Sequence, residues 1–434
     1  MSTFASLGIK KEFIESIKEL GISTPTEIQE KGIPILLNNR TDFVGLAQTG
    51  TGKTATFGLP IVQQIDPANN AVQALILSPT RELVQQIKKQ LFKYTKYYDA
   101  KVFVEAVYGG EKIERQIHNL QRTTHVIVAT PGRLIDLIER GEVHLKEIKT
   151  LVLDEADEML SMGFKQDLNR ILKYTSGHRN TWLFSATMPE EIQRIIKTYM
   201  DSNAPRVEIN RNATVNANIS HQFVKTTIKD KANTIIRFLE SRQNSRGIIF
   251  CRTKAGTQNL NKLLQEEGFS IGALEGDMQQ KERDKVMRAF KNESSRILVA
   301  TDLAARGLDI EALAFVVHYQ LPDKDEYYTH RSGRTARAGK KGESLCLLTQ
   351  KELFKVKGIE RQMRTDFTKG VIPNAQEICQ VQLKKLVEKV TSTAIREKEI
   401  QPFLPAMLSH FQDLSKEEVI KLFVSAEFNR FIEY

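Results

Sequence analysis

Short apolar runs recur along the first half of the chain, and stretches with a helical spacing of apolar residues separate them. The runs that we expect to form buried strands are residues 43–46, 74–77, 102–104, 125–129, 150–153 and 182–184. Residues 82–94 and 133–140 carry apolar side chains at the spacing of an amphipathic helix. Strands that alternate with helices predict a mostly parallel sheet with helices on both faces.

The same alternation starts again in the second half of the chain. A second set of strands is expected at residues 247–250, 271–274, 296–300, 315–319 and 344–348. Between the two sets, residues 206–220 are rich in Asn and lack apolar periodicity, which indicates a linker. The expected order is an α/β domain at 1–207, a linker at 208–219, an α/β domain at 220–365 and a small all-α extension at 366–434.

Composition and charge limit the classes of function that this protein can have. The 434 residues are 41% hydrophobic and 27% charged, which is typical of a globular protein with more than one core. No run of about 18 apolar residues and no secretory signal are found, so we expect a cytoplasmic protein without a membrane partner. The three cysteines lack a Cys-x-x-Cys pair and predict buried, inert thiols. The formal net charge of +10 is compatible with a polyanionic partner, although many proteins without one are basic.

A phosphate-binding loop is indicated at residues 47–54, where Ala-Gln-Thr-Gly-Thr-Gly-Lys-Thr follows an apolar strand and precedes a stretch compatible with a helix. Gly50 and Gly52 allow backbone N–H groups to surround phosphate oxygens. Lys53 can reach the β- and γ-phosphates, and the Thr54 hydroxyl can bind Mg²⁺. The strict pattern begins with Gly where this chain has Ala, and a glycine-rich turn before a helix is the alternative interpretation.

Adjacent carboxylates end a later strand. Residues 154–157, Asp-Glu-Ala-Asp, follow the apolar run 150–153, which places them at the carboxyl edge of the sheet, where α/β proteins bind ligands. Asp154 is suited to bind Mg²⁺, and Glu155 is suited to be the general base that orients the attacking water. An acidic helix start is the alternative. Together with the upstream phosphate loop, the segment predicts nucleotide binding and phosphoryl transfer.

Residues 154–157 spell the name of the DEAD-box RNA helicases, and the chain resembles this family from residue 4 to about residue 350. The resemblance implies two tandem RecA-like domains that bind ATP and Mg²⁺ and act on RNA. Residues 21–29 resemble the family's adenine-reading Q motif, in which Gln29 would offer adenine one donor and one acceptor. Ile22 replaces an aromatic residue that is commoner there. The implied nucleotide ligands are Phe4, Gln29, Thr49, Gly50, Thr51, Gly52, Lys53, Thr54 and Asp309.

The tripeptide Ser185-Ala186-Thr187 follows the strand at 182–184 and resembles the family motif that couples the ATP state to unwinding. Its two hydroxyls can bond to the 154–157 cluster, and Asp157 is the coupling partner that we expect. Taken alone, the tripeptide has almost no predictive value. Its position after the acidic motif gives it meaning.

Two motifs of the second half resemble the family's motifs V and VI, at residues 301–310 and 330–337. By this resemblance, Arg334 and Arg337 are arginine fingers that reach the γ-phosphate, and Asp309 approaches the ribose. Ser and Ala stand at positions 332 and 336, where the family usually has Ile and Gly. A basic surface helix is the alternative interpretation of the second motif. The implied catalytic residues are Lys53, Glu155, Arg334 and Arg337.

Short loop motifs in both halves resemble the family's RNA contacts. They combine Arg and Thr with backbone N–H groups at loop–helix junctions, which suit phosphates and carry no base identity. Contacts to 2′-OH groups would favour RNA over DNA. Each segment alone is an ordinary turn or helix start, and Glu275 and Val84 replace the family's usual His and Ala. The implied RNA-binding residues are Pro79, Thr80, Arg81, Gly110, Thr130, Gly132, Arg133, Arg252, Thr253, Gln280, Arg283 and Thr301.

These features favour an ATP-dependent RNA helicase that clamps RNA without regard to sequence and unwinds short duplexes locally, without translocation. Two other classes share part of the signal. A processive DNA translocase would have the same phosphate loop and arginine fingers, and a non-catalytic, ATP-gated RNA clamp would keep the binding residues alone. The Q motif disfavours the first class, and the complete set of catalytic residues disfavours the second.

The last part of the chain resembles the helical extension of bacterial stress-type members of the family, where it supports dimerisation. The resemblance lies at residues 372–378 and 382–387. Apolar residues at 404, 407, 408 and 411 have helical spacing and could form a dimer interface or pack on the chain's own second domain. The end at 428–434 lacks a polar tail, which raises the hypothesis of a further RNA-binding module downstream. Ribosome-assembly and RNA-degradation complexes are candidate partners.

Overall fold

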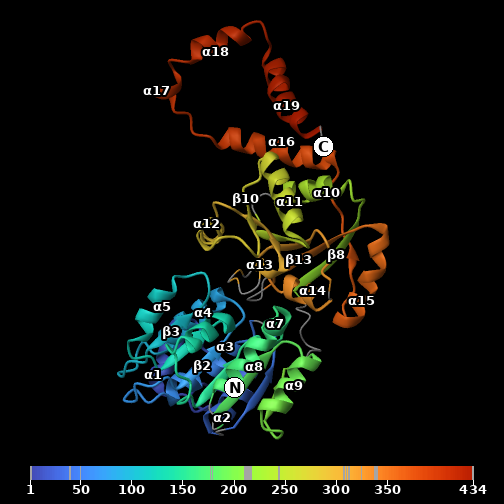
Figure 1. Cartoon of the computed structure of the whole chain (residues 1–434). Coiled ribbons are helices and arrows are strands. Elements are labelled where there is room, and N and C mark those ends of the chain that lie inside the picture. Colours follow the sequence, from blue (N-terminus) through green and yellow to red (C-terminus); the bar gives the residue numbers. More distant parts are fainter. Residues whose placement is uncertain are drawn as a thin grey trace. The chain divides into compact units, whose positions relative to one another are not determined.

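The computed structural model describes residues 2–38, 41–48, 50–175, 177, 179–209, 218–242, 245–305, 308, 310, 313–323, 325–336 and 341–432. The chain forms two compact units (Figure 1). The first comprises residues 1–217 with the short segments 276–284 and 303–311, and the second comprises the rest, including residues 366–434. Within the described part of the chain, no helix combines the length and the apolar character needed to span a membrane.

Seven parallel strands form the sheet of the first unit, in the order β3-β4-β2-β5-β6-β1-β7. Their bounds are β1 (Phe43–Leu46), β2 (Ala74–Leu77), β3 (Val104–Val107), β4 (Val126–Ala129), β5 (Thr150–Leu153), β6 (Asn180–Ser185) and β7 (Arg206–Glu208). Alternate side chains point to opposite faces: Ile76 joins one core cluster, whereas Leu75 and Leu77 join the other. The predicted parallel sheet with two covered faces is therefore confirmed.

Helices cover both faces of this sheet. They are α1 (Lys11–Glu19), α2 (Glu27–Asn38), α3 (Lys53–Gln64), α4 (Arg81–Tyr94), α5 (Ile113–Leu120), α6 (Pro131–Glu139), α7 (Ala156–Ser161), α8 (Lys165–Tyr174) and α9 (Glu190–Tyr199). Helices α1 to α4 supply apolar side chains to one core cluster, and α5 to α9 supply them to the other. The central strands β2, β4 and β5 are buried on both faces, so they appear as continuous apolar runs in the sequence.

Two expectations about strands need correction. The run 102–104 is not itself a buried strand, because β3 begins at Val104 and Phe103 is 45% exposed. Phe103 lies beside β4 at the edge of the sheet, where its carbonyl accepts the N–H groups of His125 and Val126. The expected linker at 206–220 also contains strand residues at both ends, in β7 and β8, and residues 210–217 lie outside the described part.

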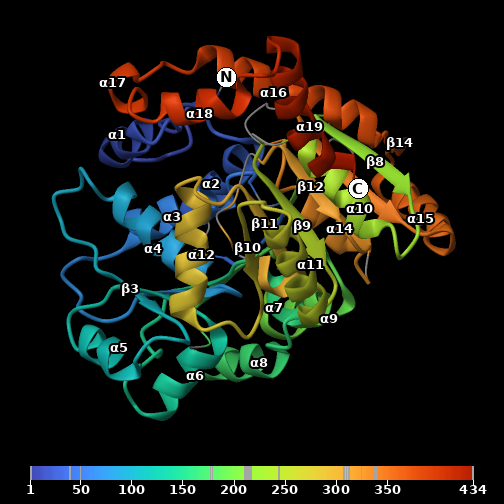
Figure 2. The same cartoon turned by 90° about the horizontal axis from the view of Figure 1, so that it is seen from above.

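The second sheet also has seven parallel strands, in the order β10-β11-β9-β12-β13-β8-β14. Their bounds are β8 (Ile219–Lys225), β9 (Gly247–Cys251), β10 (Ile271–Leu274), β11 (Ile297–Thr301), β12 (Phe315–His318), β13 (Gly342–Leu348) and β14 (Thr368–Lys369). The helices of this part are α10 (Lys231–Glu240), α11 (Lys254–Glu266), α12 (Gln280–Lys291), α13 (Asp302–Ala305), α14 (Asp325–Ser332) and α15 (Leu353–Met363). Helix α11 packs on β9, β10 and β11 (Figure 2).

The chain continues into helices α16 (Ala375–Ser392), α17 (Glu397–Ile400), α18 (Leu404–Phe411) and α19 (Lys416–Ile432). Helix α16 begins with a capping box, in which Asn374 Oδ1 accepts the Glu377 N–H and Glu377 Oε2 accepts the Asn374 N–H, each at 2.9 Å. Helix α16 contacts α10 and α19. Beyond Cys379, none of the described side chains is buried. The predicted helical extension is confirmed from Ala375 on, but its expected start at residue 366 is wrong, because Thr368–Lys369 form β14 and pair with β8 of the second sheet.

The three cysteines are free, buried thiols, as predicted. Burial raises the pKa of both Cys251 and Cys346 to about 12. Because the thiolate is the reactive form, these two groups are inert at neutral pH.

Candidate active site

The phosphate loop connects β1 to α3 through a left-handed turn. Gly52, the residue before α3, has φ 96°, and Gly50 has φ 84°. A side chain at position 52 would also collide with Gln29, because a Cβ there would lie 2.3 Å from Gln29 Nε2. Glycine at this position is therefore required both by the backbone and by the packing of the Q motif. Thr49 lies outside the described residues.

The Q motif docks directly on this loop. Gln29 Nε2 donates to the Gly52 carbonyl at 3.1 Å, and Gln29 Oε1 accepts the Thr26 N–H at 2.9 Å. The Thr26 hydroxyl donates to the Thr51 carbonyl at 2.7 Å. Gln29 is thus 2% exposed and braces the loop, a role that its sequence position does not reveal. Phe4 packs in the core and is also 2% exposed.

Lys53 and Asp154 form the buried centre of the candidate nucleotide site, with exposed fractions of 6% and 3%. Burial raises the pKa of the Asp154 carboxyl to about 7, and the Lys53 ammonium partly counteracts this rise. Asp154 Oδ1 is buried without a hydrogen-bond partner. Mg²⁺ in nucleotide sites takes one or two carboxylates together with phosphate oxygens and water. The partnerless oxygen of Asp154 and the Thr54 hydroxyl therefore fit a Mg²⁺–nucleotide complex.

Glu155 occupies an unusual backbone conformation. Its φ of 51° lies in the left-handed region, and helix α7 begins at the next residue. For a residue other than glycine this conformation costs about 1–3 kcal/mol, and such strain concentrates at functional positions. The backbone turns sharply here because the chain must leave β5 and enter α7 within two residues. Glu155 and Asp154 consequently stand at the end of the strand, as the sequence predicted.

Asp157 links the acidic motif to the segment after β6. Its Oδ2 accepts the Thr187 N–H at 2.8 Å and the Thr187 hydroxyl at 2.7 Å. The Ser185 hydroxyl donates to the Thr187 carbonyl at 2.7 Å. The structure therefore brings the three expected coupling residues together, although of the two hydroxyls only that of Thr187 bonds to the Asp157 carboxylate. Ser185 instead holds the backbone of Thr187.

The expected RNA contacts of the first unit follow three adjacent strands, β2, β4 and β3. The Thr80 hydroxyl caps α4 by accepting the Leu83 N–H at 3.4 Å. Gly110 lies against Arg81, since a Cβ at position 110 would be 2.7 Å from Arg81 Nη1. Pro79 is buried after β2, and Thr130, Gly132 and Arg133 lie at the start of α6. These residues consequently share one edge of the sheet.

Arg133 is held in place by residues that sequence reasoning missed. Its Nη1 donates to the Glu111 carbonyl at 3.2 Å and to Gln116 Oε1 at 3.3 Å. Gln116 Nε2 in turn donates to the Tyr108 carbonyl at 2.9 Å. Gln116 is 3% exposed and lies on the amphipathic helix α5, so no local signal in the sequence distinguished it from a surface glutamine. The arginine is thus pre-oriented by α5 and by the loop after β3.

The expected RNA contacts of the second half also lie near strand ends. The Thr253 hydroxyl caps α11 by accepting the Gly256 N–H at 3.1 Å, and Arg252 pairs with Asp323 at 2.5 Å. Gln280 Nε2 donates to Asp284 Oδ1 at 2.6 Å. Arg283 Nη2 donates to the Ala304 carbonyl at 2.7 Å, and Thr301 is the last residue of β11.

Glu275, which replaces the family's usual His, is neutralised locally. It is 7% exposed and accepts a hydrogen bond from Gln258 Nε2 at 2.9 Å. Lys254 Nζ lies 3.9 Å from the same carboxylate oxygen. Because a cation and an amide face this carboxylate, its charge weakens anion binding less than an exposed Glu would.

The second residue of motif VI is an arginine to which sequence reasoning assigned no role. Arg331 is 2% exposed, and its Nε and Nη2 donate to the two carboxylate oxygens of Asp302 at 2.5 and 2.6 Å. Its Nη1 donates to the Gln320 carbonyl at 2.8 Å. Arg331 therefore anchors the motif to the end of β11 and is not available to a ligand. Arg334 follows α14, whereas Arg337 and Asp309 lie outside the described residues.

Ser332 belongs to a buried polar cluster, which explains how this chain tolerates Ser where the family usually has Ile. Ser344 Oγ is central, at 2.9 Å from Ser332 Oγ, 3.0 Å from Tyr328 Oη and 3.1 Å from His318 Nε2. Burial, with a smaller effect of the Arg331 cation, lowers the pKa of His318 well below its usual value. Since Arg331 Nη1 faces His318 Nδ1 at 3.5 Å, we assign the proton to Nε2, which donates to Ser344.

Ala336, the second departure in this motif, has a φ of 56°. This left-handed conformation explains the family's preference for Gly at the position, because only Gly adopts it without a steric penalty. Ala336 is 1% exposed, so the surrounding packing enforces the conformation.

Three family descriptions match the chain in succession. "DEAD/DEAH box helicase" matches residues 26–195, and "Helicase conserved C-terminal domain" matches residues 230–339. "Probable ATP-dependent RNA helicase, helical domain" matches residues 378–434. The matches therefore include both sheets and the C-terminal helices.

Similar proteins carry related names. The DEAD-box ATP-dependent RNA helicase CshA of Geobacillus kaustophilus is 41% identical over 391 residues, which are 90% of this chain and 83% of that protein. The ATP-dependent RNA helicase CshA of Listeria monocytogenes is 40% identical over 397 residues, 92% of this chain and 76% of that protein. Among solved structures, S. cerevisiae Dbp5 bound to RNA and ADP BeF3 is 29% identical, with a TM-score of 0.79, over 90% of this chain and 100% of that chain.

The buried cluster around Ser344 yields a stability prediction. Ser344→Ala should lower the free energy of unfolding of the second unit by about 1–3 kcal/mol, because the buried His318 N–H loses its acceptor at 3.1 Å and keeps only the Ser332 oxygen at 3.4 Å. Calorimetry would show the unfolding transition of the second unit at a lower temperature in the variant than in wild type. The fluorescence of Trp182, the single tryptophan and a core residue of the first unit, would report the other transition unchanged.

Ser220→Ala is the matched control, because Ser220 is an exposed serine on the neighbouring strand β8. Its effect should stay within about 0.5 kcal/mol. Equal stability of the wild type and the Ser344→Ala variant would contradict the assigned proton positions.

Proposed function

Because the chain belongs to the DEAD-box ATP-dependent RNA helicases, we propose that it hydrolyses ATP in response to single-stranded RNA and uses this cycle to clamp RNA and separate short duplexes locally. The observation that supports this most is the buried pair Lys53 and Asp154 next to Asp157, whose carboxylate holds Thr187. The strands that carry these groups, β1, β6 and β5, are neighbours in the sheet. A change in the bound nucleotide can therefore be transmitted to the segment after β6 through the Asp157 carboxylate, which is hydrogen-bonded to Thr187.

In the proposed reaction, Glu155 orients a water molecule and accepts its proton while the water oxygen attacks the γ-phosphorus. The bond from that phosphorus to the β-phosphate oxygen breaks, and ADP leaves with the electron pair. Lys53 and the backbone N–H groups of the phosphate loop stabilise charge on the phosphate oxygens. A Mg²⁺ ion held by Asp154 and Thr54 would neutralise further charge on the β- and γ-phosphates.

The second unit would supply the remaining cations. In this proposal, RNA and ATP together bring Arg334 and Arg337 to the γ-phosphate, an effect worth about 10³–10⁵ in rate for arginine fingers. Arg331 has a different part, since its guanidinium is committed to Asp302 and the Gln320 carbonyl. It positions the motif from which the fingers extend.

The proposal predicts the response of ATP hydrolysis to nucleic acid. At a fixed moderate salt concentration, single-stranded RNA should raise the steady-state ATPase rate, and DNA of the same sequence should not. The physical reason is that hydroxyl-rich phosphate contacts can recognise 2′-OH groups, which DNA lacks. Equal stimulation by DNA would favour a translocase, and a rate unaffected by RNA would refute RNA-coupled hydrolysis.

Glu155→Gln tests the general base. The variant should retain the binding of ATP and RNA but lose about 10²–10⁴ in kcat, because the amide cannot accept the proton of the attacking water. Binding of a fluorescent ATP analogue and single-turnover hydrolysis separate the two effects. Glu147→Gln, an exposed residue before β5, is the matched control and should behave as wild type. Normal turnover by the Glu155 variant would assign the base elsewhere.

The C-terminal helices support a second part of the proposal, which is that two copies of the chain form a dimer through them. Large apolar side chains on or next to α18 and α19 are exposed, at 67% for Phe403, 63% for Leu408 and 60% for Phe423. Apolar surface of this kind, repeated along neighbouring helices, is typical of an interface. Met407 and Leu408 are 54% and 63% exposed, so neither is buried against the chain's own second sheet, which disfavours the alternative that the sequence left open.

The dimer predicts a concentration-dependent mass. Sedimentation equilibrium should show a dimer for wild type and a monomer for the double variant Leu408→Glu/Phe423→Glu, because burying two carboxylates at an interface is costly. Phe354→Glu, at a 72% exposed site on α15, is the matched control and should leave the dimer intact. A monomeric wild type at all concentrations would show the dimer proposal to be wrong.

A further inference from the structure

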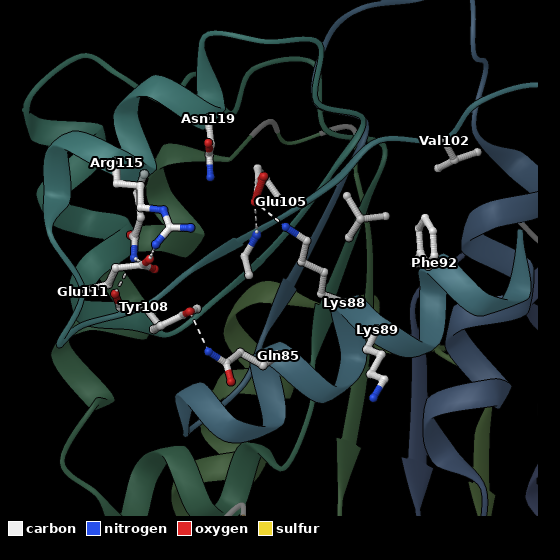
Figure 3. Close-up of a pocket in the computed structure, with 13 residues that line it drawn as sticks. Gln85, Lys88, Lys89, Phe92, Val102, Glu105, Tyr108, Glu111, Arg115 and Asn119 are labelled. Carbon is white, nitrogen blue, oxygen red and sulfur yellow. Dashed lines mark hydrogen bonds and ion pairs between the residues drawn. The ribbon is translucent and has the colours of Figure 1, made fainter. Parts of the chain in front are cut away.

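A pocket of about 360 Å³ lies beside the edge strand β3 of the first unit, between α4 and α5 (Figure 3). Tyr108 and Glu111 line one end, and Phe92 and Val102 line the other. Residues 102–108 span about 20 Å if they are extended, at about 3.3 Å per residue. The pocket is thus elongated along the strand, and none of the motifs discussed above includes its far end.

The near end of the pocket belongs to the loops that are expected to bind RNA. Glu111 and Gln116 line the pocket, and they are the two residues whose oxygens hold Arg133 at 3.2 and 3.3 Å. Tyr108, another lining residue, directly precedes Gly109 and Gly110. An RNA strand that extends from these loops along β3 would therefore reach the pocket directly.

The far end offers an aromatic surface. Phe92 is 73% exposed although it belongs to a helix whose other large apolar residues are buried. In Figure 3, Phe92 and Val102 form the wall opposite Asn119, which presents its amide to the pocket. Aromatic side chains of this kind stack on nucleobases irrespective of sequence.

The charges of the pocket favour an anionic occupant. Glu105 is paired with Lys88 at 2.7 Å, and Glu111 with Arg115 at 3.3 Å. Lys89 also lines the pocket and is exposed, and within the described part of the chain it makes no ion pair. The uncompensated charge is therefore positive and lies on the same helix as Phe92.

An extended peptide that adds a strand to the sheet is a poor fit here. The outward-facing N–H of Ala106 is already bonded to Glu105 Oε2 at 2.9 Å, so β3 does not present a free hydrogen-bonding edge at this point. Edge strands protected by a charged side chain resist such pairing.

We propose that this pocket is an additional RNA subsite, which binds a nucleotide segment that continues beyond the loops after β2, β3 and β4. Phe92 stacks on a base, Lys89 binds a phosphate, and the Asn119 amide bonds to a phosphate or ribose oxygen. The subsite lengthens the RNA footprint and adds affinity without sequence preference. This inference rests on the proposed RNA-dependent function.

The test is the dependence of affinity on RNA length. Oligouridylates of increasing length, measured by fluorescence anisotropy with the full chain and a non-hydrolysable ATP analogue, should bind wild type more tightly until the pocket is filled. Phe92→Ala and Lys89→Glu should each reduce this gain with length, by at least about fivefold for Phe92→Ala, the low end for loss of a stacked base. RNA containing 4-thiouridine should form photocrosslinks to residues 85–119 in wild type.

Phe354→Ala and Lys93→Glu are the controls and should keep the wild-type length dependence. Phe354 matches Phe92 in exposure, and Lys93 lies on α4 but does not line the pocket. Unchanged length dependence in both pocket variants, with no photocrosslink to residues 85–119, would overturn the subsite. If the variants instead lose affinity for a polyglutamate peptide alone, the pocket takes an acidic protein segment and the proposal is wrong. Absence of RNA binding by wild type would refute the proposed function itself.

Discussion

Parallel strands carry their carboxyl ends to one edge of a sheet, and the chemistry of the first unit depends on this constraint. The phosphate loop follows β1, the acidic motif follows β5, and the Ser185–Thr187 segment ends β6, so three short motifs separated in the sequence become neighbours. The constraint also explains the strain at Glu155. The chain must turn from β5 into α7 where both carboxylates are needed, and it does so through a left-handed residue. The surrounding core holds this conformation, since β5 is buried along its length.

In the second unit, the chain departs from the family's usual residues at positions whose side chains take no part in the proposed reaction. Ser332 brings a hydroxyl into the core, which would be costly without partners. Ser344 and His318 supply those partners, at 2.9 and 3.4 Å from the Ser332 oxygen. Ser344 and Arg331 also fix the proton of the His318 imidazole. Glu275 is accommodated in the same manner by an amide and an ammonium group. These substitutions are therefore compensated locally, and the anchor formed by Arg331 and Asp302 is preserved.

Buried polar groups also orient Arg133, one of the residues that we expect to contact RNA in the first unit. The Arg133 guanidinium is held by two oxygens, one from α5 and one from the loop after β3. Such pre-orientation reduces the entropy lost when a phosphate binds. The same residues shape the pocket beside β3, so the positioning of one arginine and the presence of a neighbouring cavity have a common structural cause.

The sequence by itself determined the local elements. Apolar runs of three to five residues predicted the central strands of both sheets, because strands buried on both faces must be apolar throughout. Strands β7, β8 and β14 were not predicted. Glycine spacing and strand-end carboxylates predicted the nucleotide site, because these signals lie within a few consecutive residues. The run 102–104 was misplaced, since an edge strand is half exposed and its apolar pattern is weak.

Only the tertiary structure decided which distant groups meet. The bracing of Gly52 by Gln29, the anchoring of Arg331 by Asp302 and the support of Arg133 by Gln116 all join residues at least 17 positions apart. No local pattern encodes such pairs, because a buried polar side chain can be satisfied by any element that the fold places beside it. The sequence therefore indicated which residues could do the chemistry, and the packing of the helices on the sheets decided how each of them is held.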